Sequence, residues 1–275
     1  MSPLPRVSAL AIATTLVAFA PPALAQQADE IVVTAQARNA TEVVNAGDAG
    51  ALGLKPAEDL PFTIRSYDES LILNQQPQTL GDVLDNDPTI RTTYGFGNAA
   101  EQFVIRGFPL FGDDLGLNGL YGIAPRQLVA PELFGSVQVL NGASAFLNGA
   151  APGGSGLGGN VNLVLKRAGT RDFLRATIGI EETARFGGAV DVSRRFGSGG
   201  EWGLRINAAY RDGETSIDEE YRRTAVVGGA LDYDSGPFRA ALDLAFQEIR
   251  VDNLRPKVTI ATAVIPAVPQ ADANY

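Results

Sequence analysis

The sequence predicts a membrane β-barrel that follows an export signal and a compact α+β domain. Three features indicate this: an N-terminal apolar stretch ending in a cleavage pattern, a middle region of short mixed elements, and a C-terminal region of sustained two-residue alternation. No stretch after Gln26 is apolar for long enough to be a transmembrane helix. A mature chain in a membrane would therefore have to cross it as strands.

The composition argues against several classes of function. The 275 residues contain no Cys and no His, which removes thiol nucleophiles, imidazole chemistry and metal sites built on either group. A net charge of −9 argues against nucleic acid as a partner. No nucleophile–base pair is evident, and Asp113 and Asp114 have no basic or metal partner. We therefore expect no enzyme, no catalytic residue, no cofactor and no protein-bound metal.

Residues 1–25 are typical of a secretory signal. Arg6 supplies the positive charge, residues 7–20 are apolar, and residues 23–25 (Ala-Leu-Ala) form a signal-peptidase pattern. The alternative is a buried N-terminal helix. It is disfavoured because the prolines at 21 and 22 would break such a helix.

Residues 26–57 are polar and lack a helical period, which predicts an extended, mobile segment. Near its start lies a short β-prone peptide suited to joining the sheet of a partner as an edge strand: Glu30, Ile31, Val32, Val33 and Thr34. Taken alone, an ordinary strand of the following domain is an equal alternative.

Residues 58–168 mix strands and helices, as a compact α+β domain does. A short helix is expected at 68–73, and Thr79 is expected to cap a second one. Short apolar or β-branched runs predict the strands, at 63–65, 103–105, 137–140 and 161–165.

Residues 169–275 change to a period of two over about five runs, which predicts antiparallel strands. Aromatic residues lie near the run ends, as in the interfacial girdles of a membrane barrel. Tight turns at 197–200 and 234–237 contrast with a longer loop at 212–222. A soluble β-sandwich also alternates. It would not keep apolar residues on one face through successive hairpins. Five strands cannot close a barrel, so we expect the chain to be part of a longer one.

Several motifs occur in an order that resembles the TonB-dependent outer-membrane receptors. The peptide around Ile31 resembles their TonB box in position, and residues 58–167 resemble their plug domain. The matching segments are 59–64 (DLPFTI), 79–84 (TLGDVL), 103–108 (FVIRGF), 131–142 (PELFGSVQVLNG) and 148–164 (glycine loop to VNLV). Two departures are Asn141-Gly142-Ala143, which puts a charged contact between plug and barrel in doubt, and an insertion at 155–158, which suggests looseness.

The resemblance implies a plug inside a barrel of about 22 strands in the cell outer membrane, in contact with its lipid. It implies energy from TonB with the inner-membrane proteins ExbB and ExbD. It also implies that Arg106 and Glu132 are plug–barrel latches rather than ligand contacts. The run 106–124 most resembles receptors for ferric siderophores.

For such a cargo the expected contacts at the plug apex are Tyr94, Phe96, Gly112, Asp113 and Tyr121. The neighbouring carboxylates Asp113 and Asp114 would suit a neutral or cationic siderophore better than an anionic one. Three alternatives remain open within the same class, namely cobalamin, haem and a saccharide. In a different class, a soluble periplasmic β-rich binding protein remains open.

Overall fold

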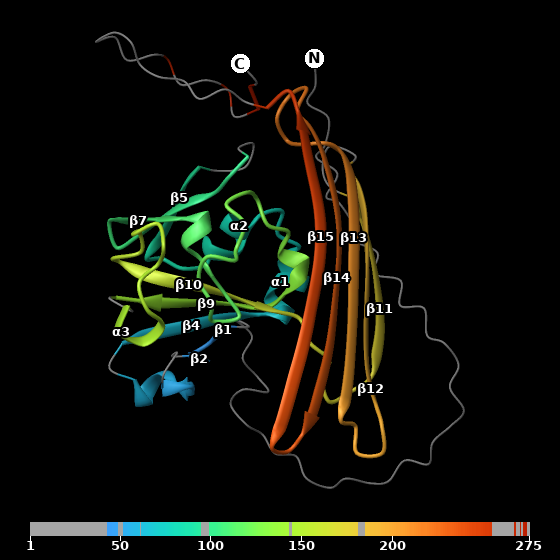
Figure 1. Ribbon diagram of the computed structural model, residues 1–275. Helices are drawn as coiled ribbons and strands as arrows, with labels where there is room; N and C mark the ends of the chain where they lie inside the picture. The colour runs from blue at the N-terminus through green and yellow to red at the C-terminus, as the bar shows by residue number, and fades with distance from the viewer. Residues whose placement is uncertain are drawn as a thin grey trace, which may run out of the picture.

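The computed structural model describes residues 43–48, 52–60, 62–94, 99–142, 145–180 and 185–254, with a few isolated positions beyond. The expected signal, the peptide at 30–34 and Phe96 lie outside the described residues. The chain forms two parts that lie side by side, a domain of mixed helices and strands and a single large sheet (Figure 1). We call residues 43–168 the plug and the sheet that follows it the wall. No helix among the described residues is long and apolar enough to cross a bilayer.

The main plug sheet has the strand order β1-β4-β9-β10-β8. Its strands are antiparallel except for the parallel pair β8 and β10. They are β1 (Val43–Val44), β4 (Thr63–Asp68), β9 (Phe134–Asn141), β10 (Gly159–Leu165) and β8 (Gly116–Leu117). The strands expected at 63–65, 137–140 and 161–165 are thus confirmed.

The last part of the segment 26–57, which was expected to be extended and mobile, contains paired strands. β1 pairs with β4, Val43 opposite Tyr67. A hairpin of β2 (Ala46–Asp48) and β3 (Leu54–Pro56) follows, and the Ser66 hydroxyl donates to the Ala46 carbonyl. These short polar strands carry little periodicity of their own. The edge of β4 supplies their hydrogen-bond partners.

A second plug sheet contains β5 (Ile90–Tyr94), β6 (Gln102–Ile105) and β7 (Phe108–Phe111). The helices are α1 (Glu69–Gln75), α2 (Leu80–Leu84) and α3 (Ala145–Asn148), and the 3-10 turns are η3 (Ala57–Asp59), η4 (Gly112–Asp114) and η5 (Pro131–Leu133). α1 begins where the Asp68 side chain accepts the Leu71 N–H at 3.0 Å. α2 begins with a capping box between Thr79 and Asp82. Both helix starts agree with the sequence.

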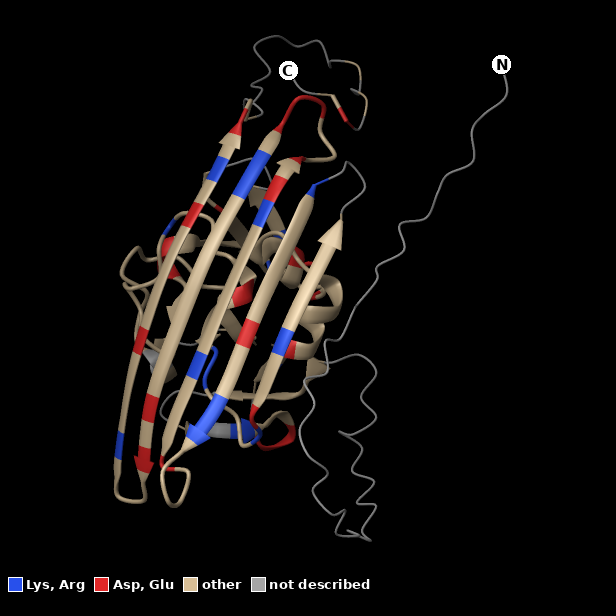
Figure 2. Ribbon diagram, turned by 90° about the vertical axis from the view of Figure 1, so that its right-hand side faces the viewer, with Lys and Arg blue, Asp and Glu red and all other residues tan. Residues whose placement is uncertain are grey.

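The wall is an antiparallel meander in the order β11-β12-β13-β14-β15. Its strands are β11 (Phe173–Ile180), β12 (Phe186–Phe196), β13 (Trp202–Glu214), β14 (Tyr221–Ser235) and β15 (Phe238–Asp252). The plug covers one face, the inner face. Figure 2 views the wall from its other face, the outer face. Large apolar side chains on this outer face are exposed, including Leu174, Ile178, Ile206, Leu242 and Leu244.

Aromatic rings form a row across one end of the outer face. Phe196 and Trp202 lie 6.3 Å apart between ring centroids, Trp202 and Tyr233 4.7 Å, and Tyr233 and Phe238 6.0 Å. At the other end the outer face becomes charged, with an ion pair between Asp212 and Arg223 at 3.3 Å. An apolar band between an aromatic row and charged residues is the pattern of a strand surface that faces lipid.

The connections lie at two ends of the wall. The turn end holds the β12–β13 and β14–β15 connections, residues 197–201 and 236–237, the latter with Gly236 at φ +63°. The loop end holds the β13–β14 connection, residues 215–220. Both ends are visible in Figure 1, with the loop end at the top. Because β13 and β14 stay paired as far as Glu214 and Tyr221, the longer loop expected at 212–222 is reduced to a connection close in length to 197–201.

Placing a charge on the outer face tests whether it contacts lipid. Ile206 is 45 % exposed and lies midway between Trp202 and Tyr210 on β13. We expect Ile206→Arg to lower the unfolding free energy of the full-length receptor in lipid vesicles by about 2–4 kcal/mol, because the charge would enter the hydrocarbon. Urea titration in vesicles measures this. Ile206→Ala is the control, and equal effects of the two variants would contradict a lipid-facing position.

Candidate functional site

A buried charge network joins the plug to the turn-end half of the wall. Asp191 of β12 accepts two hydrogen bonds from Arg205 of β13, at 2.5 and 2.7 Å, and one from the Lys166 ammonium at 3.0 Å. Glu69, the first residue of α1, reaches the same Arg205 at 2.6 Å and Arg175 of β11 at 3.1 Å. The fork geometry of Arg205 makes its pair with Asp191 bidentate. Removing one partner would leave buried charge uncompensated.

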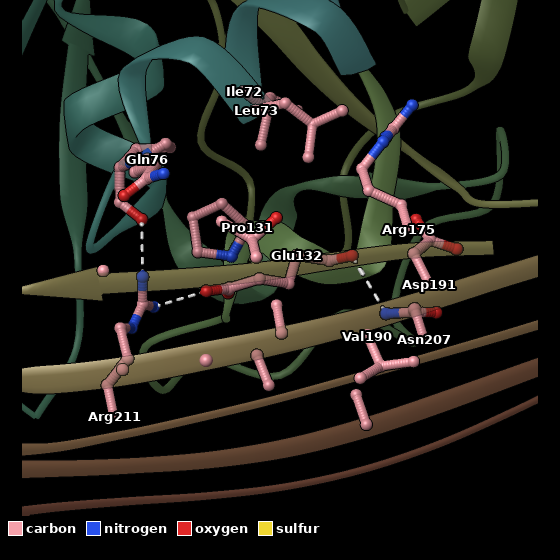
Figure 3. Close-up of a pocket in the computed structure, with 18 of the residues that line it drawn as sticks. Ile72, Leu73, Gln76, Pro131, Glu132, Arg175, Val190, Asp191, Asn207 and Arg211 are labelled. Atoms are coloured by element: carbon pink, nitrogen blue, oxygen red, sulfur yellow. Dashed lines mark hydrogen bonds and ion pairs between the residues drawn. The ribbon is translucent and has the colours of Figure 1, made fainter. Parts of the chain in front are cut away.

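A second contact lies nearer the loop end. The Glu132 carboxylate of η5 lies 2.7 Å from Arg211 of β13, and Asn207 donates to the Glu132 carbonyl at 2.9 Å. Figure 3 shows both contacts. Gln247 of β15 holds the plug segment just before η5. It donates to the Leu128 carbonyl at 2.7 Å and accepts the Ala130 N–H at 3.0 Å. Glu132 therefore lies where a plug–barrel latch requires it.

Arg106 differs from Glu132. It is exposed at the β6–β7 turn with φ +52°. The described residues of the wall offer it no ion pair. Its role as a latch stays a prediction that only other strands could fulfil.

Sequence reasoning missed a group of arginines at the loop end. Arg185, just before β12, and Arg222 of β14 are each only 1 % exposed. Arg222 donates to the Gln78 carbonyl at 3.2 Å, and Arg185 donates to the Gln78 side chain. Arg211 reaches the Pro77 carbonyl at 3.4 Å. The available signal was their position on the inner face in the two-residue alternation.

The plug carboxylates that act on Arg222 are Glu101 and Asp82. Glu101 is buried and accepts the Gly81 N–H at 2.7 Å. Burial raises the pKa of Glu101 to about 7, although hydrogen bonds from Gly81 and Thr79 oppose that rise. At neutral pH this carboxyl is therefore only a partial counter-charge for the arginines.

A cavity of about 90 Å³ separates α1 from the wall (Figure 3). Ile72, Leu73 and Gln76 line it from the plug. The wall side is made of small residues, among them Thr177, Gly179, Gly187 and Ala189. α1 is thus held to the wall by the ion pairs of Glu69 at its start and by the hydrogen bond from Arg211 to the Pro77 carbonyl beyond its end, with open space along its middle.

Three of the expected ligand residues lie at one end of the second plug sheet. Tyr94 pairs with Gln102, and Gln102 with Phe111, so Gly112 and Asp113 follow at the same edge. Arg126 lies over the Phe111 ring at 5.9 Å. A Cβ at Gly112 would lie 2.8 Å from the Arg126 carbonyl oxygen, so this close approach requires glycine. Arg126 is a cation at this edge that the sequence did not single out.

This edge adjoins a hollow of about 430 Å³ at the loop end. Ala99, Gln127 and Leu128 line the hollow from the plug, and Gln247, Ile249 and Val251 from β15. Ala100 bridges to Gln127, which connects the apical edge to this lining. We call Tyr94, Gly112, Asp113 and Arg126 the apical group.

Tyr121 lies elsewhere, in a smaller cavity with Asp114 and the glycine loop. Asp114 is 1 % exposed and accepts hydrogen bonds from the Gly153 N–H at 2.6 Å and from both the N–H and hydroxyl of Ser155. Burial alone would raise the pKa of the Asp114 carboxyl, but these bonds hold it below the usual range. The Asp114 carboxylate therefore stabilises the glycine loop through these hydrogen bonds, which corrects the expectation that Asp114 faces a cargo.

The glycine loop is also tighter than the insertion at 155–158 suggested. A Cβ at Gly158 would lie 1.9 Å from the Ile105 carbonyl oxygen, and one at Gly153 would meet the Asp114 carboxylate at 2.7 Å. The extra residues are packed against β6 and anchored by Asp114. The expectation of looseness is therefore wrong.

Comparisons with known proteins agree with this arrangement. Residues 56–155 match the family model of the TonB-dependent receptor plug domain. The ferrichrome receptor FcuA of Yersinia enterocolitica is 39 % identical over 235 residues, which cover 85 % of this chain and 31 % of FcuA. The chain thus spans about a third of the length of that relative.

Solved structures give the same result. The ferric preacinetobactin receptor BauA of Acinetobacter baumannii is 39 % identical and superposes with a TM-score of 0.81 over 85 % of this chain and 35 % of BauA. The pyoverdine outer membrane receptor FpvA of Pseudomonas aeruginosa PAO1 shares the fold, with a TM-score of 0.66 at 20 % identity over 77 % of this chain and 31 % of FpvA.

The plug, the lipid-facing wall and these likenesses agree over most of the chain. The chain belongs to the TonB-dependent receptor family and contains its plug domain and strands of its outer-membrane β-barrel.

Proposed function

We propose that the full-length protein carries a ferric siderophore across the bacterial outer membrane with energy from TonB. The observation that carries this proposal is the seating of the plug on the inner wall through charged side chains such as Glu69 and Glu132. A plug that closes a barrel but is held by polar contacts can be displaced without unfolding the barrel. The relatives whose names mention ferrichrome and ferric preacinetobactin receptors support the cargo class.

In this proposal the chelate binds at the loop end, in the hollow beside the apical group. The apical group contains one cation, Arg126, and one carboxylate, Asp113, while Asp114 is occupied by the glycine loop. The apical group therefore presents no excess of negative charge. The protein supplies orientation and contact, and the iron stays in its carrier.

The energised step takes place at the opposite side of the plug. The peptide 30–34 joins a sheet of TonB as an added strand, and ExbB and ExbD supply the force from the inner membrane. The segment leads directly into β1, the edge strand of the plug sheet. Cobalamin, haem or a saccharide remains the alternative cargo within the same class.

Deleting residues 30–34 from the full-length receptor tests the coupling. We expect cells with this variant to bind radiolabelled ferrichrome as the wild type does but to lose its accumulation, because the strand that TonB pulls is gone. Binding and accumulation are measured separately, in poisoned and in energised cells. Undiminished accumulation by the deletion variant would refute coupling through this peptide. A wild-type receptor that binds haem or cobalamin but no ferric siderophore would establish the alternative cargo.

The apical group is tested by Tyr94→Ala. Loss of one aromatic contact is expected to weaken binding of ferrichrome by about 1 kcal/mol, roughly fivefold. Tyr121→Ala is the matched control, because Tyr121 lies beside the glycine loop rather than at the apical edge. Equilibrium binding to purified full-length receptor measures both variants. A larger loss with Tyr121→Ala would place the cargo at the glycine loop instead.

The latch is tested by Glu132→Gln. This change leaves Arg211 without its carboxylate and should weaken the seating of the plug by roughly 3–5 kcal/mol. Protease protection of the plug, titrated with urea in detergent micelles, gives the midpoint. Glu248→Gln, which removes an exposed pair with Arg250 on the outer face, is the control. Identical midpoints for the two variants would show that Glu132 does not hold the plug.

A further inference from the structure

The charges on the inner wall are distributed unevenly along its height. Arginines recur on the inner face from the turn end to the loop end, in the order Arg195, Arg205, Arg175, Arg211 and Arg222, with Arg185 beside the last. The carboxylates of the same face are Asp191, Asp232, Asp234 and Asp243, and the strand register places all four in the turn-end half. The described strands carry no inner-face carboxylate in the loop-end half, although the loop above contributes the buried Glu220.

The loop-end arginines depend on the plug for most of their identified partners. Arg211 and Arg222 donate to carbonyls of the short connection between α1 and α2, Pro77 and Gln78. Arg185 donates to the side chain of Gln78 and weakly to Thr224 of the wall. When this connection leaves the wall, guanidinium groups that were buried against it are uncovered. The same displacement removes Glu132 from Arg211.

Arg211 and Arg222 face plug carboxylates, Glu132 and Glu101. Their hydrogen bonds to the carbonyls of Pro77 and Gln78, however, do not by themselves require a positive charge. Elsewhere the same wall holds plug carbonyls with neutral amides: Asn207 donates to Glu132, and Gln247 to Leu128. A carbonyl oxygen needs a donor and not a full positive charge. Desolvating an arginine for a carbonyl is therefore a costly choice for a purely static contact.

The cavity between α1 and the wall lies along the same row of inner-face arginines. It is bounded by Arg175 and Arg211 on the wall, with small residues such as Gly187 and Ala189 between them. Withdrawal of α1 would widen this space without first moving a bulky side chain of the wall. The opening would run between guanidinium groups from the loop end toward Arg205.

We propose that Arg222, Arg185, Arg211, Arg175 and Arg205 form an anion track on the inner wall, closed by α1 and the 76–79 connection in the plugged state. It takes ferric chelates of net negative charge, whose outward carboxylate, catecholate or hydroxamate oxygens accept hydrogen bonds from guanidinium groups. The inference rests on the proposed function for its cargo and assigns that cargo a charge. The apical group contains one cation (Arg126) and one carboxylate (Asp113), so it does not oppose an anionic cargo.

The local potential of the track can be measured without cargo or TonB. Ala209 lies on the inner face of β13 between Asn207 and Arg211 and is buried beneath the plug. In full-length receptor without other accessible thiols, Ala209→Cys reports on the track through its reaction rates with an anionic and a cationic methanethiosulfonate. Ala208→Cys, on the outer face, is the matched reporter. The plug is displaced with urea at a concentration that leaves the barrel folded.

The track predicts that Ala209→Cys is unreactive in the plugged receptor and, once the plug is displaced, reacts several-fold faster with the anionic than with the cationic reagent. Adding Arg211→Gln and Arg222→Gln should remove that preference. Arg211→Lys with Arg222→Lys should keep it, which separates charge from structure. Arg223→Gln, on the outer face of the same strand, should also keep it.

A rate ratio near one in the wild type, or a ratio that survives the two Gln substitutions, would overturn the track. So would the loss of the preference in the Lys variant, because the effect would then be structural. Protection of Ala209→Cys after plug displacement would show that α1 does not close this path. Failure of the proposed function would appear separately, as a wild-type receptor that accumulates no ferric siderophore.

Discussion

The arrangement of the chain depends on the bidentate pair between Arg205 and Asp191, which is shared with Glu69 and Lys166. On the outer face of the wall, lipid excludes charge. On the inner face, charge is tolerated only where another charged or polar group pairs with it. The plug supplies the partners here: the Glu69 carboxylate at the start of α1 and the Lys166 ammonium just after β10. The position of the plug is therefore fixed by electrostatic matching, with apolar packing shared between Leu133 and the small residues of β13 and β14.

Much of the architecture could be predicted from the sequence because it depends on local sequence patterns. The alternation from 173 onward identifies strands and assigns their faces, and Asp68 and Thr79 mark helix starts through their capping chemistry. The strands at 43–56 could not be predicted in the same way. They are short and polar, and their stability comes from the edge of β4, which is distant in sequence.

The site was less accessible to sequence reasoning, since its contacts join distant segments. Glu132 lies at the interface with the wall, but nothing in the sequence identifies Arg211 as its partner. Arg106, from an equally clear motif, is exposed at a turn and offers no contact to the described wall. Asp113 and Asp114 are adjacent in sequence yet serve different ends, because one lies at the apical edge and the other is buried in hydrogen bonds to the glycine loop.

The pairing of β1 with β4 has a mechanical consequence. A tension applied to the chain ahead of Val43 would load the two residue pairs of this antiparallel edge one after the other, like a zipper opened from its end. Little work is needed to separate so short a seam. The load would then pass through the short β2–β3 hairpin to β4, which is paired with β9 over six residues and continues through Asp68 into Glu69. The first element that resists strongly is thus β4, which leads into the Glu69 contacts with the wall. The edge strand β1 separates easily, and the ion pairs of Glu69 resist the force.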